Sequence, residues 1–318
     1  MFKYVLKRLG LMIFTFLIII TICFVLIKLL PIRDAAQFGK DMHIIQQRRE
    51  LLGYNKPIPE QLLIFFRRTL IGGDWGVGEN MNVAKDVWDT FISKLPSTML
   101  VNVYAMFFSV PLGLLLGIFA ALKKNKWQDH LISTGVMVFV SVPSYIFAFL
   151  VQYFLCHQLQ WFPMQSLSQA EAPLLSWKMF VSLIPAILSL SFGTIAGLAR
   201  YTRAELCEVL TNDYMLLART KGLTRAQATT RHALRNAMVP IFPMIIGEFI
   251  GIIGGSLIIE QFFGIPGVGP LYVDSITALD YNYFMLLTCF YTLIGLASNI
   301  LIDISYGFID PRIRIGER

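Results

Sequence analysis

Long apolar runs alternate with polar segments along the whole chain. Six runs stand out, at residues 9–30, 98–122, 131–156, 180–199, 238–259 and 283–306. A helix needs about 20 apolar residues to cross the hydrocarbon core of a bilayer. Because lipid offers the backbone no hydrogen-bond partners, each crossing segment must be a helix. The pattern therefore predicts an all-α integral membrane protein with six transmembrane helices, and its internal prolines mark candidate kinks: Pro111, Pro143, Pro185 and Pro243.

The composition agrees with this and excludes several function classes. The 318 residues are 56% hydrophobic and 15% charged, whereas a soluble protein carries about 25% charged residues. Basic residues are expected at the ends of membrane spans, and this explains the net charge of +7. No nucleic-acid partner is therefore predicted from the charge. The four cysteines form no CxxC pair, so neither a metal site nor a disulfide framework is predicted. No GxxxxGKS/T motif is present, and no cofactor is expected in this chain.

Basic residues in the short polar segments predict the orientation in the membrane. They gather on one side of a six-span chain, at Lys3, Lys7, Arg8, Lys123, Lys124, Lys126, Arg200, Arg203, Arg312, Arg314 and Arg318. On the other side, residues 261–282 contain no Lys or Arg, and residues 157–179 contain only Lys178. Short loops rich in Lys and Arg face the cytoplasm. Both termini are therefore predicted to be cytoplasmic, with the protein in the plasma or inner membrane.

The spans and loops divide the chain into four parts. These are residues 1–30 (N-terminal end and first span), 31–97 (external segment), 98–306 (five-helix core) and 307–318 (cytoplasmic tail). Within the external segment, apolar residues recur at helical spacing over 44–53 and 59–73. Two interpretations stay open for this segment: short helices lying on the membrane surface, or a surface on which an external receptor docks.

The most polar part of the core is the basic loop at residues 200–237. Its second half, 213–237, carries one acid, Asp213, and five basic residues: Arg219, Lys221, Arg225, Arg231 and Arg235. Asp213 is predicted to cap a helix over 214–221, and Gly222 to adopt the left-handed conformation after it. Thr224 and Gln227 have the spacing of a capping box that starts a second helix. The competing interpretations are a solvated loop, a DNA-binding element and a coupling element for a motor protein. DNA binding fits poorly beneath a bilayer with spans on both sides.

The loop resembles the EAA loop of binding-protein-dependent ABC importer permeases. That pattern runs EAA, three residues, Gly, nine residues, a hydrophobic residue, one residue, Leu-Pro. With Gly222 aligned, Ala218 and Leu234 also match, whereas the positions of the Glu, the hydrophobic residue and the Pro hold other residues. Further stretches resemble the oligopeptide, dipeptide and nickel branch in the same order: LGYNKPIPEQLL, GGDWGVG, ARTKGL, HALRNAMVP, GGSLIIEQFFGIPGVGPL and DPRIR. The likeness is closest to the B-type permease subunit of oligopeptide importers.

This resemblance implies a type I ABC importer permease fold and a set of partners. In that family two permeases form the pore, two cytoplasmic ATPase subunits bind ATP and Mg, and an external peptide-binding protein delivers the peptide. The chain itself would carry no catalytic residues. The residues implied to couple to the ATPase are Ala218, Arg219, Lys221, Gly222, Leu223, Thr224 and Arg225. The alternatives are a dipeptide or nickel permease and, from another class, an ion-coupled secondary transporter.

Inside the spans, Glu248 is the clearest ionisable residue. An acid at membrane depth usually faces a cavity or a partner. Glu248 is therefore a candidate for the translocation pathway, with a helix-packing carboxylate as the alternative. Gly247, Gly251 and Gly255 have GxxxG spacing, which predicts close helix packing within the chain or against the second permease. Residues 263–269, FGIPGVG, are either an external gate or a tight turn.

Overall fold

The computed structural model describes residues 2–29, 50 and 53–309. The α-helices are α1 (Phe2–Lys28), α3 (Ile58–Phe66), α4 (Val87–Leu122), α5 (Trp127–Ser141), α6 (Ser144–Val151), α7 (Trp177–Val209), α8 (Asp213–Thr220), α9 (Arg225–Ala228), α10 (Leu234–Gly254), α11 (Leu257–Phe262), α12 (Val268–Thr277) and α13 (Tyr281–Ile309). Short π-helical stretches extend three of them, namely η2 (Arg67–Ile71), η3 (Gln152–Gln158) and η4 (Thr229–Ala233).

The described residues contain five helices long and apolar enough to cross a membrane, and a sixth if one bent pair is counted as a span. The bent pair replaces the single helix predicted at 131–156. The axis of the α6–η3 helix is bent by 104° from that of α5. Pro143 explains the bend, because proline has no N–H and pushes the residue before it into extended backbone. Val142 indeed has φ −96° and ψ 127°. With the pair counted as one span, the predicted all-α, six-span fold is confirmed.

Several span boundaries differ from the sequence prediction, and two of these differences have a clear local cause. α4 begins at Val87 rather than near residue 98, because the Asp86 carboxylate caps it and accepts a hydrogen bond of 3.0 Å from the Asp89 backbone N–H. The fifth span ends at Gly254 rather than at residue 259, because Gly255 adopts the left-handed conformation with φ +66°. The chain then makes the short helices α11 and α12 before entering α13.

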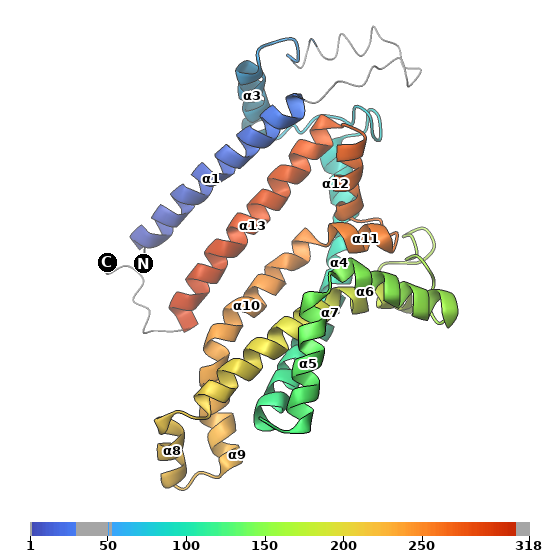
Figure 1. Cartoon of the computed structure of the whole chain (residues 1–318). Helices are drawn as coiled ribbons and strands as arrows, with labels where there is room; N and C mark the ends of the chain where they lie inside the picture. The colour runs from blue at the N-terminus through green and yellow to red at the C-terminus, as the bar shows by residue number, and fades with distance from the viewer. Residues whose placement is uncertain (1, 30–49, 51–52, 310–318) are drawn as a thin grey trace.

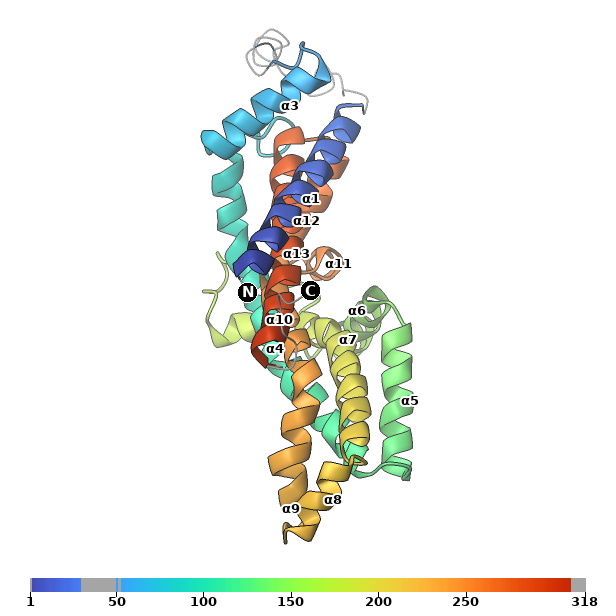
Figure 2. The same ribbon diagram turned by 90° about the vertical axis from the view of Figure 1, so that its left-hand side faces the viewer.

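The spans are arranged in a continuous series of packed neighbours. α1 packs against α13, α13 against α10, and α10 against α4 and α7, while α5 and α6 flank α7 (Figures 1 and 2). Glycines allow α4 to approach α7 closely: a Cβ at Gly113 would lie 2.9 Å from Leu198 Cβ, and one at Gly117 would lie 2.6 Å from Thr202 Cβ. The α8–α9 hairpin and the α4–α5 turn lie at one end of the molecule, and α3 and α12 at the other (Figure 1).

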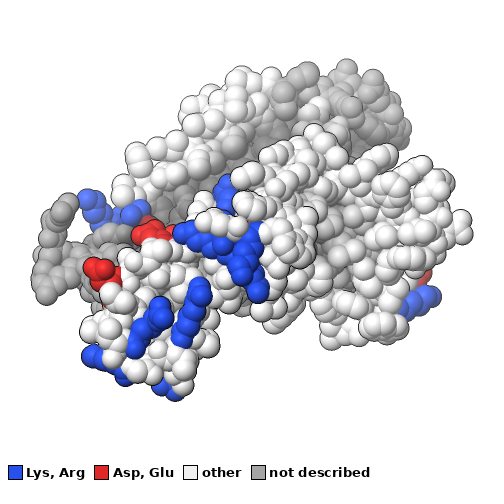
Figure 3. Space-filling model, turned by 60° about the horizontal axis from the view of Figure 1, so that its bottom comes forward, with Lys and Arg blue, Asp and Glu red and all other residues white. Residues whose placement is uncertain are grey.

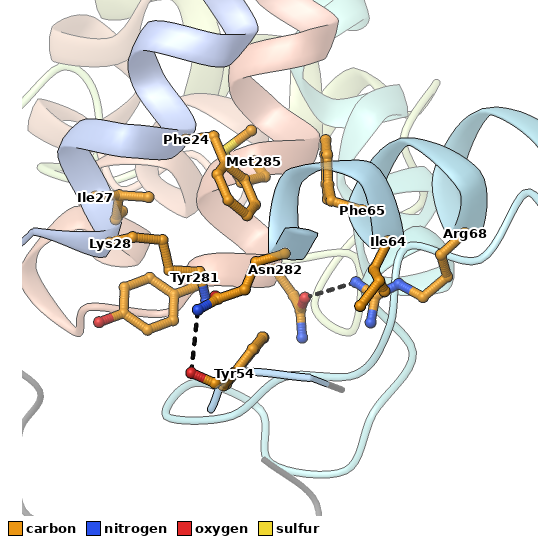
Figure 4. Close-up of a pocket in the computed structure, with 11 residues that line it drawn as sticks. Phe24, Ile27, Lys28, Tyr54, Ile64, Phe65, Arg68, Tyr281, Asn282 and Met285 are labelled. Carbon is orange, nitrogen blue, oxygen red and sulfur yellow. Dashed lines mark hydrogen bonds between the residues drawn. The ribbon is translucent and has the colours of Figure 1, made fainter. Parts of the chain in front are cut away.

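The segment between the first two spans is anchored on the beginning of α13. Of the two helices predicted there, the one at 59–73 is present as α3 and η2, and most of 44–53 lies outside the described residues. Arg68 on η2 donates a hydrogen bond of 3.0 Å to Asn282 Oδ1 (Figure 4). In the same place, Lys28 Nζ lies 3.4 Å from the centre of the Tyr54 ring, a close cation–π contact.

A buried carboxylate completes this anchor. Asp280, which is fully buried, accepts hydrogen bonds from the backbone N–H groups of Glu79 and Asn80 (2.8 Å each) and Met81 (3.0 Å). Hydrogen bonds to a charged acceptor are among the stronger ones in proteins. The loop before α4 is therefore held directly against the start of the last span.

Candidate functional site

The basic knob, defined as residues 213–228, consists of α8, a tight turn and α9. The cap of α8 differs from the prediction, because Asn212 occupies the N-cap position and Asp213 lies in the first turn, where its charge complements the helix dipole. Gly222 follows the helix with φ +90°, in the left-handed region that the sequence predicts. Thr224 and Gln227 form the predicted capping box: the Thr224 N–H lies 3.0 Å from the Gln227 amide oxygen, and the Gln227 N–H 3.3 Å from the Thr224 hydroxyl.

The second half of the knob is the beginning of the fifth span rather than a separate helix. α9 continues through η4 into α10, so that Arg225–Gly254 is one helix of 30 residues. At a rise of 1.5 Å per residue this helix is roughly 45 Å long. A force applied to the knob therefore acts directly on a helix that reaches the interior of the membrane domain.

One face of the knob packs on the protein and the other is free. Met215, Ala218 and Ala228 are buried against Leu206 and Cys207 of α7. Seen from the end of the molecule that holds the knob, several Lys and Arg side chains are scattered over a mostly uncharged surface, with few acids among them (Figure 3). The exposed residues there include Arg219, Lys221, Gly222, Thr224 and Arg225.

The residues implied to couple to an ATPase fall into two groups, those buried or half-buried against the protein and those exposed on the outer face. Ala218 is buried within the chain and Leu223 is half-buried, so these two support the knob from behind. Leu216 and Leu217, which the sequence analysis did not select, are 64% and 55% exposed. Leu216 precedes Arg219 by three positions on α8, so exposed apolar and basic side chains are neighbours on this helix, a combination that protein interfaces commonly have. The position of the two leucines in a short polar loop was the signal that would have identified them.

An ion pair between the partly exposed Arg203 and the buried Asp129 stabilises the surface on which the knob rests. Asp129 on α5 is fully buried, and its two oxygens accept hydrogen bonds from Arg203 of α7, from Nε at 2.5 Å and from Nη2 at 2.7 Å. The Asn125 backbone N–H, at 2.9 Å, also binds this carboxylate. A bidentate pair of this kind is geometrically specific. Leu206, on which the knob packs, lies one helical turn after Arg203 on α7. The ion pair therefore links the part of α7 that supports the knob to α5. The sequence analysis treated Arg203 only as a loop charge.

A cavity of about 250 Å³ lies between α4, α7 and α10. Its polar lining is Asn102, Ser109, Thr194, Glu248 and Ser256. Glu248 lies at the middle of the apolar run 238–259 and Thr194 lies within the run 180–199, which places this part of the cavity within the predicted membrane spans. The Glu248 carboxylate is exposed in the chain and accepts one hydrogen bond, from Thr194 Oγ1 at 3.3 Å. The carboxylate is therefore not enclosed by its neighbours within the described part of this chain, and its role in the translocation pathway stays a prediction.

The three glycines of α10 do not share one packing face within this chain. A Cβ at Gly247 would lie 3.2 Å from Ile302 Cδ1, so this glycine packs against α13. Gly251 lines the cavity and has no neighbouring atom within 4 Å of its Cβ position. Gly255 ends the helix in the left-handed conformation. Lack of space within the described residues therefore explains Gly247 and Gly255 but not Gly251.

Beyond the cavity, residues 256–269 fold around the carboxylate of Glu260, which is fully buried. Its Oε2 accepts hydrogen bonds from Thr98 Oγ1 (2.9 Å) and the Gly269 N–H (3.0 Å), and its Oε1 accepts from the Ser256 N–H (3.2 Å). Thr98 Oγ1 in turn accepts from the Val268 N–H at 2.8 Å. Burial raises the pKa of the Glu260 carboxyl, and these donors oppose part of that rise.

Two positions beside this carboxylate, Gly255 and Gly267, leave no space for a Cβ atom. A Cβ at either Gly255 or Gly267 would lie in severe overlap with a Glu260 oxygen. Residues 263–269 are therefore a fixed turn in this structure, clamped to α4 through Thr98. The sequence analysis missed both Glu260 and Thr98. A single acid flanked by glycines, within an apolar stretch, was the available signal.

Comparison with known proteins identifies the family. Residues 113–315 match the binding-protein-dependent transport system inner membrane component family, and residues 1–102 match the N-terminal part described for the same type of membrane component. The chain belongs to this family. It is a permease subunit of an ABC importer and not an enzyme, and ATP hydrolysis resides on partner subunits. This assignment decides against an ion-coupled secondary transporter and places the protein in the inner membrane.

Relatives match over essentially their whole length. The dipeptide transport system permease protein DppB of Lactococcus lactis subsp. cremoris (strain MG1363) is 31% identical over 315 residues, covering 99% of this chain and 100% of that protein. The glutathione transport system permease protein GsiC of Escherichia coli (strain K12) is 31% identical over 317 residues, covering 99% of each chain.

Two solved transporters share the fold of the permease. The inward-facing MetNI methionine ABC transporter has a TM-score of 0.51 at 17% identity, covering 69% of this chain and 97% of that chain. An amino acid ABC transporter crystallised with histidines has a TM-score of 0.51 at 20% identity, covering 70% of this chain and 94% of that chain. These likenesses show the ABC permease fold for this chain.

Proposed function

We propose that this permease imports short peptides and forms one half of a translocation pore with a second, homologous permease subunit. Oligopeptides are the cargo that the sequence favours, with dipeptides as the alternative. The names of full-length relatives, a dipeptide and a glutathione permease, support peptides. The observation that carries the proposal is a polar cavity at membrane depth, lined by residues of three spans.

The lining of the cavity favours peptides over nickel. The described residues that line it supply one carboxylate together with hydroxyl and amide groups, and they include no His or Cys. Imidazole and thiolate groups are the ligands that suit nickel and other late transition metals in proteins. Hydroxyl, amide and carboxylate groups are suited to the N–H and ammonium donors of a peptide.

The basic knob is the proposed contact with the ATPase subunits, which would bind ATP and Mg; this chain would hold neither. Its support is threefold: a rigid capped turn, an exposed basic and apolar face, and direct continuity with α10. Closure of the ATPases would displace the knob, and the Arg225–Gly254 helix would carry that displacement to the wall of the cavity. An external peptide-binding protein would deliver the peptide at the opposite end.

The proposed orientation, with both termini and the knob in the cytoplasm, predicts a labelling pattern. In a variant whose four native cysteines are replaced, a cysteine at Lys124 or Arg225 should be protected from a membrane-impermeant thiol reagent in intact cells. A cysteine at Asp274 should react. All three positions are exposed in the structure, and labelling at 225 is repeated in permeabilised cells that lack the ATPase subunits, so that cover by these subunits is distinguished from sidedness. Reaction at position 225 from outside, before permeabilisation, would contradict this orientation.

Transport itself tests the proposed cargo. Cells lacking this permease should lose uptake of labelled trialanine and regain it with the intact gene. Unlabelled peptides of two to six residues should compete for that uptake, and NiCl2 should not. Competition by nickel without competition by peptides would reject the peptide assignment in favour of the nickel alternative.

A further inference from the structure

We propose that Glu248 recognises the positively charged amino group of the cargo, so that the pore itself selects peptides with a free amino terminus. This inference rests on the proposed function, because it concerns the same cavity. The juxtaposition behind it is an exposed carboxylate, at membrane depth, in a cavity of about 250 Å³ lined otherwise by neutral groups.

The first step concerns the charge of the carboxylate. An ionised acid at membrane depth is costly unless a cation or several hydrogen-bond donors compensate it. Among the described residues, Glu248 has one donor, Thr194 Oγ1 at 3.3 Å, and takes part in no ion pair. The buried Glu260 carboxylate of the same chain differs, because three hydrogen-bond donors contact its two oxygens. The Glu248 site therefore retains capacity for an external cation.

The second step concerns the neighbouring groups. The Asn102 amide nitrogen already donates to the Thr98 carbonyl oxygen at 2.7 Å, which leaves its amide oxygen as a further acceptor beside the cavity. Ser109 donates within its own helix, to the Met106 carbonyl oxygen. The polar lining is thus rich in acceptors, and an ammonium group is a donor of three hydrogen bonds with no acceptor of its own.

The third step distinguishes an organic cation from a metal ion. Stable metal sites are built from several protein ligands at fixed distances. Within the described part of the chain, no group of three or more His, Cys, Asp or Glu side chains is placed to hold a metal. A single carboxylate beside amide and hydroxyl oxygens matches the hydrogen-bonding needs of an amino terminus better than the coordination needs of a divalent ion.

The test measures binding to the assembled permease–ATPase complex in nanodiscs, without the external binding protein and without ATP, so that the receptor's own selectivity does not enter. The probes are trialanine, N-acetyl-trialanine, which lacks the positive charge, and trialanine amide, which lacks the negative one. The variants are Glu248→Gln, which removes the charge at constant size, and Glu248→Asp, which keeps it. Glu208→Gln is the matched control, because this exposed acid lies 14 residues from Thr194 on α7, roughly 21 Å along the helix.

The wild type should bind trialanine at least tenfold more tightly than N-acetyl-trialanine. Glu248→Gln should remove that difference by weakening trialanine binding only, Glu248→Asp should retain most of it, and Glu208→Gln should leave it unchanged. The trialanine amide should bind like trialanine. This pattern is a pairwise coupling between one carboxylate and one amino group.

Two outcomes would overturn the inference. Equal loss of both peptides in Glu248→Gln would assign the residue a general role in pore structure. Loss of the second permease subunit from purified Glu248→Gln complexes, with acetylation having no effect in the wild type, would show that a cation of that subunit pairs with Glu248. The proposed function is tested separately by cellular uptake of trialanine. It fails if cells with the wild-type permease take up no more trialanine than cells that lack it.

Discussion

Gly222→Val is expected to abolish coupled transport while leaving the protein inserted in the membrane. Gly222 has φ +90°, and no atom lies within 4 Å of its Cβ position, so the cost of a side chain there is conformational and not steric. A β-branched residue in this region is strained by about 1–3 kcal/mol. The turn between α8 and α9 should therefore rearrange, and the knob should lose its shape. Gly222→Asn is the control, because Asn tolerates left-handed backbone and should retain most of the uptake.

The charges on the knob provide a second test of the same surface. Arg219→Glu combined with Arg225→Glu should weaken attachment of the ATPase subunits, because two exposed cations become anions at a proposed interface. Replacing both residues with Lys keeps the charge and should reduce attachment much less. The measurement is ATPase recovery in pull-downs from membranes, beside peptide uptake. Wild-type recovery and uptake in both Gly222→Val and the double Glu variant would remove the knob from the coupling mechanism.

Glu260→Ala is expected to give the second large effect, a loss of thermal stability and of uptake. The substitution leaves the Thr98 hydroxyl and the N–H groups of Ser256 and Gly269 without their acceptor. Each buried unsatisfied group costs about 1–3 kcal/mol. Glu260→Gln keeps one acceptor oxygen and should be intermediate. Gln261→Ala, at the exposed neighbouring position, is the matched control and should behave like the wild type.

The measurement for Glu260 is the midpoint of thermal unfolding in detergent, followed by uptake assays at a temperature where the variant remains folded. The expected order of midpoints is wild type and Gln261→Ala, then Glu260→Gln, then Glu260→Ala. If the unfolding midpoint of Glu260→Ala equalled that of the wild type, the hydrogen bonds between α4 and residues 256–269 would contribute nothing to thermal stability.

The sequence predicted the features that depend on local patterns. Long apolar runs predict membrane spans because the length of a helix and the thickness of the bilayer are directly related. The left-handed Gly222 and the Thr224–Gln227 capping box were predicted because both depend on residues within one or two helical turns. The bend at Pro143 has the same local origin.

The features that the sequence did not predict depend on pairs of residues far apart in the chain. Glu260 meets Thr98 across 162 positions, and Arg203 meets Asp129 across 74. Periodicity describes only one element at a time and gives no information about such partners. For the same reason, the spacing of Gly247, Gly251 and Gly255 did not show that the three positions have different surroundings, with a close neighbour at Gly247 and Gly255 but none within 4 Å of the Cβ position of Gly251.

The central claim, that this chain is the peptide-conducting permease of an ABC importer, is tested most directly by reconstitution. The purified permease pair, its ATPase subunits and the external binding protein would be placed in liposomes with the ATPases facing the outer solution. The account predicts export of labelled trialanine from the lumen to the outer solution that requires outside ATP and Mg, stops with a non-hydrolysable ATP analogue, and is lost with Gly222→Val. Peptide movement that continues unchanged without ATP, or that follows an imposed ion gradient, would contradict it.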